Sequence, residues 1–113
     1  MHAPLHSFPV LETNRLLLRE MVSADAPDLL RLLSDPEVVR YYDMRLTRTI
    51  SEVYAMIARH QYRFEHDEGI RWAVTLKHQP RTPIGTCGLF WEWSRQRGEL
   101  SYALAKPFWG QGL

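Results

Sequence analysis

The alternation of apolar and polar residues between positions 70 and 105 most limits what this chain can fold into. In the run 70–76 every second residue is large and apolar, from Ile70 to Leu76, which is the period of a β-strand. Two more strand-like runs follow, at 84–93 and 99–105. Turn-forming residues separate the three runs, at 79–83 and at 94–98. Strands joined by such short turns pair side by side, so the sequence predicts an antiparallel meander.

A long helix is predicted directly before this meander. Thr49 and Glu52 have the spacing of a capping box, in which each side chain bonds the other residue's backbone N–H. The pattern predicts a helix over 50–66 whose apolar stripe includes Val53, Tyr54 and Ile57, and Gly69 is expected to end it.

Shorter elements are predicted nearer the start of the chain. The run 15–19 is apolar between arginines and favours a strand. Either Ser23 or Asp25 can cap a helix over 25–33, and Asp35 followed by Pro36 starts a short helix through Val39. The order of strand, helices and three further strands predicts an α+β fold with one antiparallel sheet.

Composition excludes several classes of protein. The chain has 113 residues and a formal charge of +1, which gives no general attraction to nucleic acid. Its single cysteine, Cys87, rules out an internal disulfide framework, and no spacing of histidines suggests a metal site. No apolar run is long enough to span a membrane and no signal peptide is recognised, so a cytoplasmic protein is expected. We expect 1–10 to be a loose leader and 11–113 to be one folding unit.

The strand 99–105 is followed by a glycine-spaced segment, Gly110-Gln111-Gly112. Such a segment either closes the strand as a surface turn or lets backbone amides approach an anion. Glycines alone do not decide between the two.

An ordered set of short matches resembles the GNAT N-acetyltransferases, and most of all the branch that acetylates ribosomal-protein N-termini. The matches run from Leu11–Arg19 through Ser34–Val38 and Ile84-Gly85-Thr86 to Tyr102 and Trp109–Gly112. In that family a Gln/Arg-x-x-Gly-x-Gly/Ala motif binds the coenzyme A pyrophosphate through backbone amides. Trp109 stands at the Gln/Arg position, Gly112 is the first glycine, and the last motif position would be residue 114. The resemblance therefore implies the N-terminal part of a GNAT domain, truncated before its C-terminal half.

The resemblance also implies which residues meet acetyl-CoA, the expected co-substrate; no metal is expected. The strand 99–105 corresponds to the family strand whose backbone contacts the thioester and pantetheine. The implied cofactor-binding residues are Ala103, Leu104, Ala105, Trp109, Gly110, Gln111, Gly112 and Leu113.

Acceptor and proton-transfer residues are implied in the same way. Glu99 stands four residues before Ala103, where some family members place the general base that takes the proton of the attacking amine. Glu99 could equally be a solvated surface carboxylate. Glu92 is a second acidic candidate, and Tyr41 and Tyr42 stand where the family builds its acceptor pocket, although aromatic residues there can also serve packing.

Two functions are compatible with these observations. The first is an N-acetyltransferase that moves acetyl from acetyl-CoA to a primary amine of a small molecule or a protein N-terminus, with activity lost or reduced in a truncated chain. The second is a non-catalytic GNAT module that self-associates through an exposed edge at 99–105 or binds a partner chain. Neither nucleic acid nor membrane is an expected partner.

Overall fold

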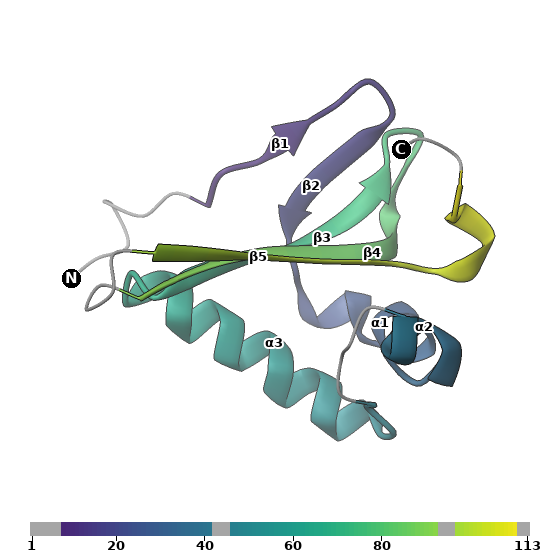
Figure 1. Ribbon diagram of the computed structural model, residues 1–113, viewed down its shortest axis with the longest axis horizontal. Helices are drawn as coiled ribbons and strands as arrows, with labels where there is room; N and C mark the ends of the chain where they lie inside the picture. Colours follow the sequence, from purple (N-terminus) through teal and green to yellow (C-terminus); the bar gives the residue numbers. More distant parts are fainter. Residues whose placement is uncertain (1–7, 42–45, 93–96, 111–113) are drawn as a thin grey trace.

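The computed structural model describes residues 8–41, 46–92 and 97–110, with backbone alone at 90–92 and 97–101. Five strands form one antiparallel sheet in sequence order, with the helices on one side of it (Figure 1). This confirms the predicted α+β fold. The elements are β1 (Leu11–Glu12), β2 (Leu16–Glu20), η2 (Ser23–Asp25), α1 (Ala26–Leu33), α2 (Pro36–Tyr41), α3 (Ile50–Glu65), β3 (Gly69–Leu76), β4 (Gln79–Glu92), β5 (Arg97–Leu104) and η4 (Lys106–Phe108).

The turn between β3 and β4 is shorter than predicted. It consists of residues 77–78, and the segment 79–83 already belongs to β4. Prolines lack the N–H that a strand donates, which is why this segment was assigned to a turn. The sheet accommodates them through register shifts, because Thr75 is aligned with Pro83 but Leu76 with Gln79. The predicted turn at 94–98 lies largely outside the described residues, and β5 begins at Arg97.

Helix α3 begins at the predicted residue, but the Glu52 carboxylate bonds the Thr49 hydroxyl instead of the Thr49 N–H of the predicted capping box, and the helix ends differently. The Glu52 N–H donates to Thr49 Oγ1 at 3.2 Å, and the Thr49 hydroxyl donates to the Glu52 carboxylate at 3.1 Å. At the other end Asp67 takes the left-handed conformation, with φ of 57°. Gly69 was therefore wrongly assigned as the stop, since it is the first residue of β3. Tyr54 was also misplaced, because it is 47% exposed while Val53 and Ile57 are buried.

Asp25 occupies the cap position of α1, but its side chain makes no capping hydrogen bond to that helix. Its carboxylate instead accepts two hydrogen bonds from the Arg19 guanidinium, at 2.7 and 2.9 Å, and one from the Val22 N–H at 2.8 Å. The Arg19 Nε–H also donates to the Pro80 carbonyl at 2.7 Å. The pair of Asp25 and Arg19 thus joins β2, the start of α1 and the start of β4.

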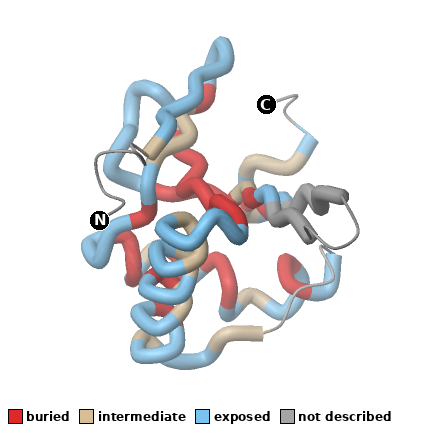
Figure 2. Tube along the Cα trace, turned by 90° about the vertical axis from the view of Figure 1, so that its left-hand side faces the viewer, coloured by how far each residue is buried: buried red, intermediate tan, exposed pale blue. Residues whose placement is uncertain are grey.

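Part of the core fills the space between the sheet and the helices, and part lies on the opposite face of the sheet, because Ala73 and Val74 are neighbours on β3 and face opposite sides. Figure 2 shows the buried stretches along the strands and behind the mostly exposed outer side of α3. One cluster joins α1 and α3 to Ala73 of β3. On the sheet, Leu16, Val74, Ile84 and Leu104 form a second cluster, against which Phe108 and Trp109 pack.

Candidate active site

Strand β5 is an edge strand of the described sheet, since β4 alone pairs with it. The Ala105 N–H donates to the Ile84 carbonyl at 2.7 Å. The N–H and C=O groups of successive residues point to opposite sides of an antiparallel strand. The N–H and C=O of Ala103 therefore also face β4, whereas those of Leu104 face the outer edge. Of the three residues proposed from sequence on this strand, Leu104 is the one whose backbone lies on the open side.

The segment after β5 lies at the same end of the sheet as α1 and α2 (Figure 1). The indole N–H of Trp109 donates to the Leu104 carbonyl at 2.8 Å, and its ring lies 4.7 Å from the ring of Tyr41. An ion pair of 2.6 Å between Lys106 and Glu37 ties η4 to α2. Trp109, expected in a glycine-spaced loop, thus follows a 3-10 turn and joins the end of β5 to the residue proposed for the acceptor pocket.

Gly110 has a conformation that favours glycine. Its φ is +73°, and a Cβ built there would meet no atom within 4 Å. The Gly110 backbone therefore adopts the left-handed conformation, and the space beside its Cα is open. Gln111, Gly112 and Leu113 lie outside the described residues.

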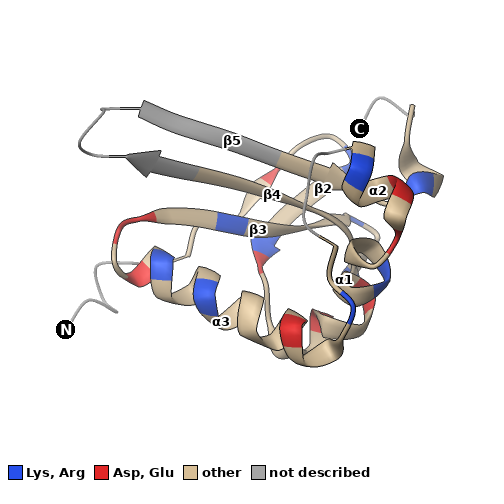
Figure 3. Cartoon of the chain, turned by 60° about the horizontal axis from the view of Figure 1, so that its bottom comes forward, with Lys and Arg blue, Asp and Glu red and all other residues tan. Residues whose placement is uncertain are grey.

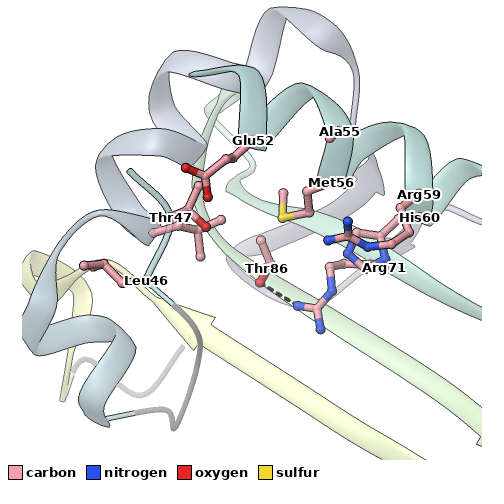
Figure 4. Close-up of a pocket in the computed structure, with 10 residues that line it drawn as sticks. Leu46, Thr47, Glu52, Ala55, Met56, Arg59, His60, Arg71 and Thr86 are labelled. Carbon is pink, nitrogen blue, oxygen red and sulfur yellow. Dashed lines mark hydrogen bonds between the residues drawn. The ribbon is translucent and has the colours of Figure 1, made fainter. Parts of the chain in front are cut away.

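A cavity of about 330 Å³ opens beneath the sheet on the helix side (Figure 4). It lies between α3, β3, β4 and the segment before α3. Its walls include Thr47, Glu52, Met56, Arg59, His60, Arg71 and Thr86. Thr86 is aligned with Ala103 of β5, so the cavity adjoins the strand proposed to contact the thioester.

Arg71 is the most buried charged side chain in the wall of this cavity, with 8% of its surface exposed. Its Nη1 donates to Thr86 Oγ1 at 2.8 Å. A Cβ at Gly88 would lie 3.1 Å from the guanidinium, so the missing side chain of Gly88 lets the guanidinium rest on β4. Burial lowers the pKa of Arg71, but an arginine remains charged at neutral pH.

Basic residues gather at one end of the cavity. Figure 3 shows the basic residue of β3 beside those in the second half of α3, with an acidic residue near the start of that helix. Burial, followed by the charges of Arg71, Arg63 and Arg59, lowers the pKa of His60 from 6.5 to about 3. His60 is therefore a neutral hydrogen-bonding group at pH 7.

Replacing His60 with glutamine should make stability less sensitive to acid. Between pH 6.5 and about 3 the unfolded chain binds a proton at His60 that the folded chain does not, so wild-type stability falls as the pH falls through this window. The loss approaches about 1.4 kcal/mol per pH unit. Arg59, Arg63, Arg71, Glu20 and Glu52 surround this site and remain in both proteins. Urea unfolding at pH 7 and 5 measures the effect, and equal pH slopes in the two proteins would contradict it.

The structure gives a backbone position, but no side-chain position, for the acidic candidates. Glu99 is aligned with Phe90 and Glu92 with Arg97. Tyr42 lies outside the described residues, and Tyr41 is 69% exposed with its ring against Trp109.

None of the cavity-lining residues was predicted from the sequence to be a catalytic or binding residue. One available signal was Arg71, a charge inside a strand that the preceding helix covers. Among the described residues, no cluster of three potential metal ligands was found. No helix in the described part of the chain is long and apolar enough to cross a membrane.

Comparison with known proteins identifies relatives over most of the chain. The model of the acetyltransferase (GNAT) domain matches residues 15–113. The uncharacterized N-acetyltransferase YoaA of Bacillus subtilis (strain 168) is 31% identical over 107 residues, which is 94% of this chain and 60% of YoaA. The uncharacterized N-acetyltransferase p20 of Bacillus licheniformis is 32% identical over 104 residues, which is 91% of this chain and 58% of p20. This chain therefore spans about 60% of the length of these curated relatives.

Solved structures share the fold at low sequence identity. The apo form of RimL, a ribosomal L7/L12 alpha-N-protein acetyltransferase, superposes with a TM-score of 0.74 at 14% identity, over 96% of this chain and 59% of RimL. A GNAT-family acetyltransferase from Bacillus anthracis gives 0.73 at 14% identity, over 92% of this chain and 58% of that one. MccE, the microcin C7 self-immunity acetyltransferase, gives 0.71 at 13% identity, over 88% and 56%. With the sheet, the helices on one face and the domain match over residues 15–113, the chain belongs to the GNAT acetyltransferase family.

Proposed function

We propose that this chain supplies the acceptor side and part of the cofactor edge of an N-acetyltransferase that moves acetyl from acetyl-CoA to a primary amine. The observation that carries the proposal is a juxtaposition. A cavity large enough for a small ligand adjoins, through the pair Thr86 and Ala103, an edge strand with outward-facing backbone groups. The acceptor is a small amine or the N-terminal α-amine of a protein, and the single cysteine suits a reducing cytoplasm.

The residues that would hold acetyl-CoA lie at the end of β5 and beyond it. The outward N–H of Leu104 can donate to the extended pantetheine, since the Leu104 carbonyl already accepts the Trp109 indole N–H, while Ala103 and Ala105 hold β5 against β4. Trp109 fixes the segment, and the backbone of Gly110 leads into Gln111, Gly112 and Leu113, which we assign to the pyrophosphate. RimL in complex with coenzyme A and MccE in complex with acetyl-CoA and AMP support this assignment by their fold. The acyl donor supplies a thioester carbonyl, and a backbone N–H aimed at its oxygen stabilises the developing negative charge.

The amine must lose a proton to attack. Its nitrogen forms a bond to the carbonyl carbon as the C–S bond breaks, and the proton that leaves the nitrogen is matched by the one the thiolate takes up. We propose Glu99 as the base, because it lies on β5 close to the strands that line the cavity. Glu99 is two residues from Ser101. Ser101 is aligned with Gly88 of β4, and Gly88 is aligned with Arg71 of β3. An α-amine with pKa near about 8 needs less help than a lysine near about 10.4. Tyr41, Tyr42 and Glu92 remain proposed acceptor contacts.

A transfer assay tests this function. Mass spectrometry would follow acetylation of a panel of amines by the 113-residue chain and by a chimaera that adds the part of YoaA beyond the matched region. We expect transfer by the chimaera and little or none by the shorter chain. Glu99→Gln in the chimaera should reduce turnover most at low pH, where a larger fraction of the amine is protonated, and leave acetyl-CoA binding intact.

Two results would contradict these proposals. Failure of the chimaera to acetylate any amine, although it is folded, would overturn the proposed function. An unchanged pH–rate profile for Glu99→Gln would remove Glu99 from proton transfer but keep the function.

A second candidate function is association through the edge of β5. One side of this strand has no neighbour in the described sheet, and Tyr102 on it is 37% exposed. Such an edge can pair with another strand. Sedimentation velocity on the 113-residue chain at micromolar concentration should therefore show a dimer or a larger species. A sharp monomer boundary would contradict this.

A further inference from the structure

The outer edge of β5 is partly covered where the strand ends. The N–H and C=O of Leu104 both face this edge, because Ala105 on the other side of the strand bonds β4. The indole N–H of Trp109 donates to the Leu104 carbonyl at 2.8 Å. The amide nitrogen of a further strand would lie about 2.9 Å from the same oxygen. The indole therefore occupies the place that a strand paired with Leu104 would need.

A tight turn brings Trp109 back to the strand. The Phe108 N–H donates to the Ala105 carbonyl and the Trp109 N–H to the Lys106 carbonyl, each at 3.0 Å. These two bonds close the 3-10 turn η4, so a residue five positions after Leu104 lies beside it. The backbone of η4 thus sets the position of the indole.

Helices α1 and α2 hold the indole from the other side. The ring of Tyr41 lies 4.7 Å from that of Trp109, with 30° between the ring planes. Trp109 also packs against an apolar cluster of these two helices, formed by Leu32, Leu33 and Val38. The ion pair of 2.6 Å between Lys106 and Glu37 joins η4 to α2 beside these contacts. Because Trp109 is fixed by the protein itself, its bond to Leu104 forms before any ligand binds.

We propose that Trp109 covers the outer edge of β5 at Leu104, so that this end of the edge donates one N–H to acetyl-CoA and does not pair with another strand. A paired strand uses both the N–H and the C=O of an outward-facing residue. An amide carbonyl of pantetheine uses the N–H alone. Covering an edge is one way in which proteins prevent unwanted strand pairing.

The cover limits where a second copy can pair with β5. Association through this edge is left to the residues before Leu104, which include the 37% exposed Tyr102. The cofactor part of this inference rests on the proposed acetyl transfer. The covering of the edge against strand pairing does not.

Trp109→Phe in the 113-residue chain tests the cover, because phenylalanine keeps an aromatic ring beside Tyr41 but has no N–H. The Leu104 carbonyl freed in each copy can then accept a hydrogen bond from a paired copy. We expect sedimentation equilibrium to give an association constant at least about tenfold higher than that of the wild type. Trp109→Ala, which removes the ring as well, should raise it further. Association of both variants equal to that of the wild type would overturn the cover.

Trp72→Phe is the matched control. The Trp72 indole N–H also donates to a backbone carbonyl, that of Pro9, at 2.9 Å. Trp72 lies on β3, away from the outer edge of β5, so its loss should leave the association constant unchanged. If Trp72→Phe raises association as much as Trp109→Phe does, a general loss of stability explains the result and the inference fails.

Hydrogen exchange followed by NMR tests the same arrangement in the unaltered chain. The Trp109 indole N–H should exchange slowly because it is bonded to a carbonyl, and the Leu104 N–H rapidly because it faces the edge. Millimolar acetyl-CoA should slow exchange at Leu104 and leave the indole N–H protected. An indole N–H that exchanges as fast as that of free tryptophan would overturn the cover.

The two experiments separate this inference from the proposed function. Slowed exchange at Leu104 together with stronger association of Trp109→Phe supports both parts of the inference. Unaffected exchange at Leu104 with stronger association would overturn the cofactor part and the proposed position of acetyl-CoA, while the cover stands. Slowed exchange at Leu104 with unchanged association would overturn the cover and leave the proposed function intact.

Discussion

Replacing Gly85 with alanine is expected to destabilise the protein by about 3 kcal/mol or more. A Cβ at this position would lie 2.1 Å from the Ala103 carbonyl oxygen and 2.9 Å from Leu104 Cδ2. The nearer atom belongs to the backbone of β5, so relief requires the two strands to separate. Urea denaturation measures the loss.

Gly88→Ala is the matched control for this prediction. Its Cβ would meet the Arg71 guanidinium at 3.1 Å, which is the far end of a flexible side chain that can move. A smaller loss of stability is expected there. If Gly85→Ala unfolds within about 0.5 kcal/mol of the wild type, the close approach of β4 and β5 described above is wrong.

Asp25→Asn is expected to have the second large effect. The Asp25 side chain is 2% exposed and the Arg19 side chain 19% exposed, and their closest atoms are 2.7 Å apart. An amide cannot accept both guanidinium bonds and the Val22 N–H, which leaves a mostly buried cation with too few acceptors. Breaking a buried pair from one side costs about 3 kcal/mol or more, even allowing for the partial exposure of Arg19.

The exposed pair of Asp28 and Arg31 provides the comparison. Its arginine is 78% exposed, and its closest atoms are 3.1 Å apart. Asp28→Asn should therefore cost no more than about 0.5 kcal/mol. Thermal or urea unfolding of the two variants gives the contrast, and equal losses would show that Asp25 is not the junction of β2, α1 and β4.

Local patterns predicted most of the fold because each reports a short-range constraint. The alternation in 70–76 and the capping residue Thr49 gave correct elements, since burial of one face and the cap act within a few residues. The start of β4 was missed because the register shifts that accommodate Pro80 and Pro83 depend on β3. Gly69 was misassigned because Asp67 takes the left-handed position instead. The two-residue strand β1 has too short a pattern to detect.

The candidate site was likewise predicted only in part from the sequence. The resemblance to the GNAT family drew attention to the end of β5, and the structure has an outward N–H at Leu104 and a left-handed Gly110 there. The cavity could not be found from local sequence, because it is formed by side chains from α3, β3 and β4 whose positions depend on packing. Arg71 and Thr86 are fifteen residues apart and meet only across paired strands.

We propose above that acetyl-CoA lies along the outer edge of β5 and over the segment after it. NMR titration of the isotope-labelled chain with millimolar acetyl-CoA tests this most directly, since every backbone amide reports its own surroundings. We expect the largest shifts at Leu104 and Gly110, with small shifts for β1 and β2 at the far edge of the sheet. No response at saturating concentration, or shifts centred on β1 and β2, would contradict it.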